Sequence, residues 1–145
     1  MRVVVDASVT IKWLLPERPD EDHGEQALAL LDAVRNDQVN LIQPPHWLAE
    51  VGSVLARLEP TLAKPAIALL HALETPLKDE PEIYSSGIDL AIDLNHHLFD
   101  TLYHAVALNG LAETLITSDL RYFRKARHKG SICTLAEFVR NAKYN

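Results

Sequence analysis

The sequence predicts an α/β fold in which a short, mainly parallel central sheet is flanked by helices. Short β-branched or apolar runs alternate along the chain with longer segments of helical periodicity, which is typical of a parallel sheet covered on both faces. No repeat, low-complexity stretch or linker-like segment interrupts the 145 residues, and 48% of them are hydrophobic. We therefore expect one domain over residues 1–145 with a substantial core.

Four short segments are expected to be strands because β-branched or apolar residues dominate them. The first, RVVVD, ends in a polar residue at Asp6, and the third, TLIT, is followed two residues later by Asp119. The expected strands are 2–6, 39–43, 114–117 and 131–134.

The segments between these strands carry apolar residues at helical spacing. Pro45 is well placed to open one helix, whereas Pro65 must sit in the first turn of another or bend it. The segment 99–111 is apolar almost all round, so we expect it to be buried. The expected helices are 8–15, 20–36, 45–58, 61–73, 83–94, 99–111, 119–129 and 135–142.

Composition argues against membrane and secreted proteins. No window approaches the roughly 18 unbroken apolar residues of a membrane span. Asp6 interrupts any apolar core of a signal peptide. Cys133 is the single cysteine, so it cannot form an internal disulfide; we expect a buried thiol and a reducing cytoplasmic location.

Two aspartates follow predicted strands. The carboxyl ends of parallel strands meet at one edge of a sheet, so Asp6 and Asp119 should emerge together, where ligands of such sheets bind. Each also has a simpler explanation as the N-cap of the next helix, with Ser118 competing for the second cap. Taken alone, either aspartate is explained as well by capping.

Two further acids lie on predicted helices. Glu50 comes three residues after Trp47 and four before Val54, so it shares an apolar helix face on which an unpaired carboxylate would be costly. Asp100 lies in the first turn of the apolar segment 99–111, where it could favour the helix dipole or face the other acids. Carboxylates suit Mg²⁺ and Mn²⁺, and the expected ligands are Asp6, Glu50, Asp100 and Asp119.

Phosphodiester hydrolysis is the chemistry that such a cluster performs. A bound cation activates water and neutralises charge on the phosphate, and no Ser-His-Asp or Cys-His arrangement competes for this role. Ser8 and Thr117 can hydrogen-bond the carboxylates or the water around the ion, or be ordinary small residues at strand ends. A phospho-acceptor receiver domain would need a second acid beside Asp6, which the chain lacks.

The histidines do not indicate zinc, because no HExxH motif occurs and Cys133 has no partner thiol. His96 and His97 precede a helix start and are expected to be solvated. His104 follows Asp100 by four residues, so it either reaches the acids or packs within the helix layer.

Basic residues cluster in the C-terminal part of the chain, although the net charge is −6. Five of the fourteen Lys and Arg residues fall within positions 121–129, and no acid occurs from 120 to 136. This is either a solvated helix whose basic end suits the dipole, or a surface that attracts phosphate. The five are Arg121, Arg124, Lys125, Arg127 and Lys129.

Taken together, these motifs resemble the PIN domain, and within it the ribonuclease toxins of the VapBC type. The resemblance covers residues 2–136 in the family's order and spacing. One departure is Ser53, where many members carry Asn. The matching residues are Asp6 and Ser8 in VVVDASVTIKWLLPE, Pro45 and Glu50, Asp100 in FDTLYHAVAL, and Thr117 and Asp119 in LITSDLRYF.

The resemblance implies a three-layer PIN-like sandwich, dependence on Mg²⁺ or Mn²⁺, and RNA as substrate. It also implies a homodimer and an antitoxin protein that covers the site. It favours a role for Arg121, Arg124 and Lys125 in holding RNA phosphates beside the metal. The hypothesis is a metal-dependent endoribonuclease that acts as the toxin of a toxin–antitoxin pair. The alternative is a catalytically inactive PIN-like module that binds RNA or protein.

Overall fold

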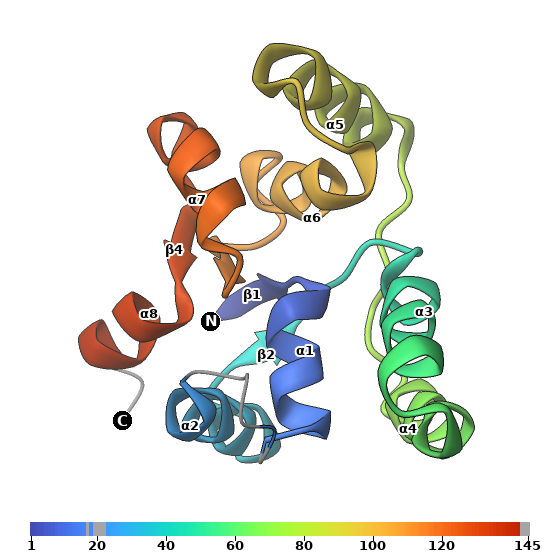
Figure 1. The fold of residues 1–145 in the computed structure, drawn as a ribbon. Helices are drawn as coiled ribbons and strands as arrows, with labels where there is room; N and C mark the ends of the chain where they lie inside the picture. The colour runs from blue at the N-terminus through green and yellow to red at the C-terminus, as the bar shows by residue number, and fades with distance from the viewer. Residues whose placement is uncertain (17, 19–22, 143–145) are drawn as a thin grey trace.

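The computed structural model describes residues 1–16, 18 and 23–142 (Figure 1). In this part of the chain four parallel strands form one sheet, in the order β2-β1-β3-β4. The predicted α/β class, with a short parallel sheet flanked by helices, is confirmed. The strands are β1 (Arg2–Val5), β2 (Asn40–Leu41), β3 (Thr114–Thr117) and β4 (Ile132–Thr134).

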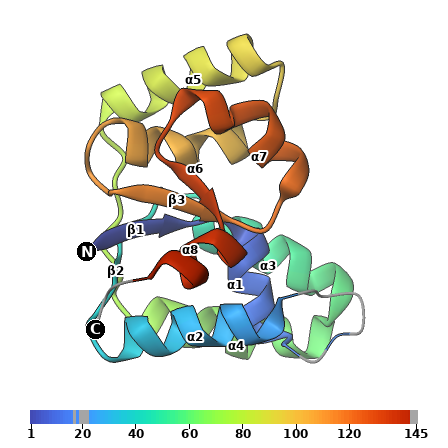
Figure 2. The same ribbon diagram turned by 90° about the vertical axis from the view of Figure 1, so that its left-hand side faces the viewer.

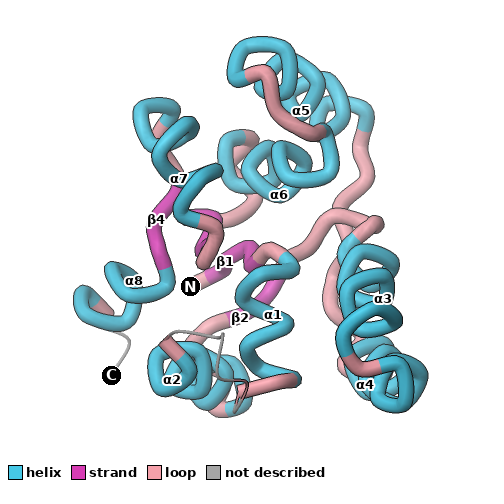
Figure 3. The backbone as a smooth tube through the Cα atoms, viewed as in Figure 1, coloured by secondary structure: helices cyan, strands magenta, loops and turns pink. Residues whose placement is uncertain are grey.

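Helices make up most of the remaining chain (Figure 3). One face of the sheet is covered by α6, with α5 packed behind it, and the other face by α1, against which α2 packs (Figure 2). The α3–α4 pair lies beside the sheet and contacts α1. The helices are α1 (Ala7–Leu14), α2 (Gly24–Arg35), α3 (Trp47–Leu58), α4 (Pro60–Ala72), α5 (Pro81–Leu94), α6 (Leu98–Leu108), α7 (Leu120–Ala126), the 3₁₀ turn η1 (Arg127–Lys129) and α8 (Leu135–Asn141).

The second strand is shorter than the predicted 39–43 because, at Gln43, the side chain and not the backbone makes the hydrogen bonds to β1. Gln43 is fully buried; its Nε2 donates to the Val5 carbonyl at 2.7 Å, and its Oε1 accepts from the Val5 N–H at 2.9 Å. Its backbone meanwhile pairs with Leu77 in an isolated bridge. The carboxyl end of β1, one residue before Asp6, is therefore held by an amide side chain.

Prolines shift two of the predicted helix starts. Helix α3 begins at Trp47 rather than at Pro45, which lies in the preceding turn. Helix α4 begins at Pro60, so Pro65 falls in its second turn rather than its first. Proline has no N–H, so Pro65 cannot donate to the Thr61 carbonyl one turn earlier.

Other predicted bounds also change. The helix predicted over 119–129 is divided into α7 and η1, and the one over 99–111 ends earlier, at Leu108, before a turn in which Gly110 has a φ of 77°. Helix α2 begins at Gly24, and positions 20–22 of the predicted 20–36 lie outside the described residues.

The central helix α6 is buried as predicted. Every residue from Thr101 to Ala107 is buried, between the sheet and α5. Cys133 is only half-buried, where we expected full burial; its Sγ accepts a 3.6 Å contact from the Thr114 hydroxyl, and burial raises the pKa of the thiol. Among the described helices, none is both long and apolar enough to cross a membrane.

Candidate active site

Asp6 follows β1 and is almost completely buried, with 8% of its surface exposed. Its Oδ1 accepts hydrogen bonds from the Ser8 hydroxyl and, at 3.3 Å, from the Val9 N–H, so Asp6 is the N-cap of α1. Its Oδ2 accepts a hydrogen bond from the Thr117 hydroxyl. Ser8 in turn accepts the Ser118 N–H at 2.9 Å. The capping role and the position at the sheet edge therefore occur together.

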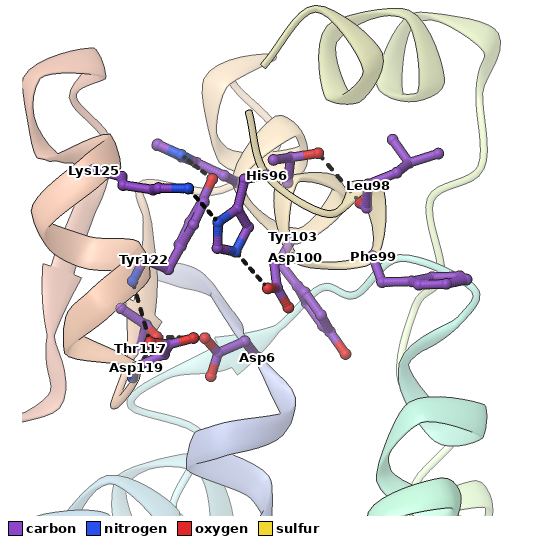
Figure 4. A network of polar contacts seen from close by, with 12 residues as sticks. Asp6, His96, Leu98, Phe99, Asp100, Tyr103, Thr117, Asp119, Tyr122 and Lys125 are labelled. Atoms are coloured by element: carbon purple, nitrogen blue, oxygen red, sulfur yellow. Dashed lines mark hydrogen bonds and ion pairs between the residues drawn. The ribbon is translucent and has the colours of Figure 1, made fainter. Parts of the chain in front are cut away.

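Asp119 lies beside Asp6 and is connected to it through one threonine (Figure 4). The Asp119 N–H donates to the Thr117 hydroxyl at 2.9 Å, and that hydroxyl donates to Asp6. Asp119 Oδ1 accepts the Tyr122 N–H at 3.1 Å and so caps α7. Ser118 was the competing cap, but its hydroxyl makes no hydrogen bond within the described residues. The β1 and β3 ends thus form one hydrogen-bonded unit.

Asp100, in the first turn of α6, is held by an imidazole. His96 Nε2 lies 2.7 Å from Asp100 Oδ2, and the Lys125 ammonium lies 3.2 Å from His96 Nδ1 (Figure 4). Because an ammonium group only donates, Nδ1 accepts and Nε2 carries the proton given to Asp100. The His96 side chain is only 8% exposed, so the prediction that it is solvated was wrong; His97 is exposed as expected.

Glu50, in the first turn of α3, is half-buried and faces α6. Its Oε2 lies 3.3 Å from the Tyr103 hydroxyl and 3.3 Å from His46 Nε2. His46 Nε2 also lies 2.7 Å from the Phe99 carbonyl, and the His46 ring packs on the Phe99 and Tyr103 rings. Neither His46 nor Tyr103 was predicted as a site residue. Tyr103 is 53 positions from Glu50, so no local pattern indicates it, whereas His46 precedes Glu50 by four residues, a helical spacing that could have indicated the contact.

Burial and mutual repulsion raise the pKa values of two of the acids. Burial raises the pKa of Asp6 to about 7, against the hydrogen bonds that it accepts, and the charge of Asp100 raises it further. Burial also raises the pKa of Asp100; the His96 hydrogen bond opposes this, and the charges of Glu50 and Asp119 add to it. Asp100 therefore interacts electrostatically with each of the other three acids.

Two buried tyrosines border these acids (Figure 4). Burial raises the pKa of Tyr103, and the charges of Glu50, Asp6 and Asp100 add to the effect. Burial likewise raises the pKa of Tyr122, which also lies in the field of the acids. Both hydroxyls therefore stay neutral.

Several predicted residues lie elsewhere. His104 is buried, with Nδ1 2.9 Å from the Tyr122 hydroxyl and Nε2 2.7 Å from the Gly130 carbonyl, and burial lowers its pKa. It packs within the helix layer, which was one of its two expected roles. Ser53 is exposed, and no hydrogen bond is made by its side chain within the described residues. The predicted RNA-binding residues all lie on α7, directly after Asp119; they are Arg121, Arg124 and Lys125.

A family model described as PIN domain matches residues 2–121, a span that includes all four acids. The chain belongs to the PIN domain family. PIN domains are generally nucleases and typically use divalent metals, so family membership indicates a nuclease. No curated protein matches the chain.

The four acids of this PIN domain offer carboxylate oxygens, which are suitable ligands for a divalent cation. One oxygen on each of three carboxylates has no hydrogen-bond partner within the described residues: Glu50 Oε1, Asp100 Oδ1 and Asp119 Oδ2. Hard cations such as Mg²⁺ prefer carboxylate oxygens. Nevertheless, no three His, Cys, Asp or Glu side chains in the described chain are already arranged to hold a metal ion. Binding would therefore require side chains to turn toward the ion.

Proposed function

We propose that this PIN domain is a Mg²⁺- or Mn²⁺-dependent endoribonuclease, the toxin of a VapBC-type pair. Its metal ligands would be Asp6, Glu50, Asp100 and Asp119. The observation that carries the proposal is that acids from four distant segments lie close enough for Asp100 to interact with all three others. Such crowding is costly for anions alone and favourable around a cation.

The neighbours of the acids support this role because they hold oxygen atoms in place. When bound, the cation would lower the pKa of a water molecule and neutralise charge on the phosphate. Thr117 and Ser8 donate hydrogen bonds to the two oxygens of Asp6, so they would support it as a metal ligand. His96 holds one oxygen of Asp100 and leaves the other available.

The substrate and partners are proposed on charge and on the resemblance. Arg121, Arg124 and Lys125 follow Asp119 directly and would hold RNA phosphates beside the metal. A homodimer and an antitoxin protein that covers the acids remain predictions. A cytoplasmic location suits the single thiol, Cys133.

A cleavage assay tests the proposal. Wild-type protein should cut RNA with Mn²⁺ and stop when EDTA is added. Asp6→Asn should abolish cutting, whereas Asp89→Asn, a matched change at an exposed position of α5, should not. Cutting that survives EDTA or Asp6→Asn would contradict the metal-ligand proposal. A folded wild type that binds RNA and cuts none would instead support the inactive module.

Metal-dependent stability gives a second readout that needs no substrate. A cation that binds only the folded chain stabilises it by roughly 2.7 kcal/mol at a hundred times its dissociation constant. The melting temperature should therefore rise with Mn²⁺ in the wild type and in Asp89→Asn, and stay constant in Asp6→Asn. A wild-type melting temperature that does not change with Mn²⁺ near neutral pH would contradict the proposed metal site.

A further inference from the structure

We propose that a basic pocket beside the acids binds a phosphate group of the RNA strand, next to the phosphate that is cut. The inference rests on the proposed function and assigns a separate subsite to it. The pocket has a volume of about 240 Å³ and is lined by Asn95, His96, His97, Arg121 and Lys125.

Two segments far apart in the sequence form this pocket. Asn95, His96 and His97 belong to the connection between α5 and α6, and the two cations lie on α7. Arg121 and Lys125 are four residues apart, so they share one face of the helix. The close-up shows Lys125 reaching from α7 to His96 (Figure 4).

The pocket adjoins the acids through shared residues. His96 lines the pocket and also hydrogen-bonds Asp100 at 2.7 Å. Arg121, which also lines the pocket, comes two residues after Asp119 in the sequence. We therefore expect a strand whose cut phosphate lies at the acids to pass beside the pocket, because His96 belongs to both.

The donors in the pocket are not used up by the protein. The Lys125 ammonium contacts the Asn95 carbonyl at 3.1 Å and His96 Nδ1 at 3.2 Å, which leaves one of its three N–H donors. Arg121 makes no hydrogen bond or ion pair within the described part of the chain. A guanidinium offers a fork of donors that matches phosphate oxygens.

Two neighbouring cations of the same basic run, unlike Arg121, already have partners within the protein. Lys129 is paired with Asp93 at 2.9 Å, and the Arg127 guanidinium lies over the Phe123 ring at 5.6 Å. Their interactions account for those two charges without a ligand. Arg121 and Arg124 are exposed and have no such partner in the described chain, and of these two only Arg121 lines the pocket.

Phosphate is the ligand that this chemistry and charge balance favour. No carboxylate lines the pocket, and every lining residue carries a hydrogen-bond donor. The chain has a net charge of −6, so a polyanion is repelled overall and needs a local cationic site near the acids. A nucleic-acid strand beside a nuclease centre supplies such phosphates at regular spacing.

The test is the affinity for a short single-stranded oligoribonucleotide in EDTA, measured by fluorescence anisotropy over a range of salt concentrations. Arg121→Gln should weaken binding about tenfold, the size expected for a hydrogen bond to a charged group. It should also reduce the slope of log K against log salt by about 0.7, the value for one phosphate contact on a single strand. Lys125→Gln should act in the same direction.

Two controls separate the pocket from general charge effects. Arg140→Gln removes the same charge from an exposed position on α8 and should leave affinity and slope near wild type. Arg124→Gln removes it from α7 outside the pocket; because Arg124 is itself proposed to hold RNA phosphate, this variant serves as a control only for the binding of inorganic phosphate to the pocket, which it should leave unchanged. Because Arg121 is exposed and has no partner in the described chain, its substitution should leave the melting temperature unchanged.

A second probe is inorganic phosphate itself. Titration should shift the NMR signals of the His96 and His97 rings until they saturate, and Arg121→Gln should abolish this shift. Equal RNA affinities and slopes for Arg121→Gln and Arg140→Gln, or equal losses of the phosphate-induced shift in Arg121→Gln and Arg124→Gln, would overturn the pocket and leave the nuclease proposal standing. Loss of affinity in Arg121→Gln alone, without RNA cleavage under any metal, would support the pocket and contradict the nuclease.

Discussion

The acids that follow strands and the acids that lie on helices are held in different ways. Asp6 and Asp119 are joined through Thr117, and each caps a helix, so backbone groups and a hydroxyl hold them. Asp100 and Glu50 lie in the first turns of α6 and α3 and are held by imidazole and phenol side chains. One pair belongs to the sheet edge, and the other faces it from two helices.

This difference indicates that the two pairs of acids would contribute differently to the binding of a cation. Both oxygens of Asp6 already accept hydrogen bonds, and its backbone N–H donates to the Ile116 carbonyl of β3 at 3.4 Å, so its position is set before any ion binds. Asp119, Asp100 and Glu50 each keep one oxygen without a hydrogen bond in the described chain. The other oxygen of Asp119 is held by the α7 backbone, whereas Asp100 and Glu50 are held only by side chains, which can turn at little cost. We expect the strand-end pair to locate the ion and the helix pair to adjust to it.

The largest expected effect is on catalysis, and it should be the same for either pair. Asp100→Asn should lower kcat/KM about a thousandfold, a magnitude typical of losing electrostatic stabilisation at a reacting phosphate. Folding should be preserved because Asp100 is only half-buried and its charge is repelled by neighbouring acids. Cleavage kinetics and urea unfolding check this, with Asp89→Asn as control. Near-normal activity would remove Asp100 from the site.

The next effect is a pH dependence of stability caused mainly by Asp6, to which the raised pKa of Asp100 adds in the same direction. The pKa of Asp6 is raised from 3.8 to about 7 in the folded chain, so between these values the folded state retains a proton that the unfolded state has lost. The free energy of unfolding of the metal-free protein should therefore fall as pH rises from 4 to 7, by a few kcal/mol, since one pKa unit corresponds to ~1.4 kcal/mol.

Asp6→Asn should remove most of this pH dependence, because Asn does not ionise. Chemical denaturation in EDTA at a series of pH values measures the effect. The same slope in Asp6→Asn as in wild type would show that another group causes it.

A smaller effect should follow when the imidazole that holds Asp100 is removed. His96→Phe keeps a ring against Tyr122, 4.9 Å away between centroids, and removes both nitrogen atoms. Losing such a supporting hydrogen bond typically weakens metal affinity about 10- to 100-fold. Mn²⁺ titration followed by calorimetry checks this, and His128→Phe at an exposed position is the control. Unchanged Mn²⁺ affinity would mean that Asp100 needs no such support.

The smallest effect is expected at Tyr103, whose hydroxyl contacts Glu50 at the long distance of 3.3 Å. Tyr103→Phe should lower kcat/KM roughly threefold, because a neutral hydrogen bond contributes only about 0.5–1.5 kcal/mol. Burial of the ring should be unchanged, so the melting temperature is the control readout. A loss as large as that of Asp100→Asn would show that Tyr103 acts directly in the reaction.

Much of the fold was predictable because its signals are local. The third strand has the predicted bounds, 114–117, and α6 is buried as its apolar composition indicated. The second strand was overestimated because the side chain of Gln43 takes the place of backbone pairing with β1. A glutamine at the end of an apolar run gives no local sign of that role.

Within the candidate site, the placement of the two strand-end acids was predictable from the direction of the strands. Asp6 and Asp119 follow strands, so the rule that parallel strands share a carboxyl edge was enough to bring them together. His96 was misjudged, because its burial depends on Lys125, 29 positions away, and on the Tyr122 ring. Of the two partners of Glu50, Tyr103 was missed because it comes from α6, 53 positions away, whereas His46 lies only four residues before Glu50 and its helical spacing was overlooked.

The sequence by itself determined the class of fold, the order of its elements and the identity of the acids that lie at one end of the sheet. These follow from periodicity and strand direction, which are properties of neighbouring residues. Only the tertiary structure decided which side chain holds each carboxylate and which cations are left without a partner. Those outcomes depend on the distances between helices that are far apart in the sequence. They also depend on the burial of each side chain, which several segments determine together.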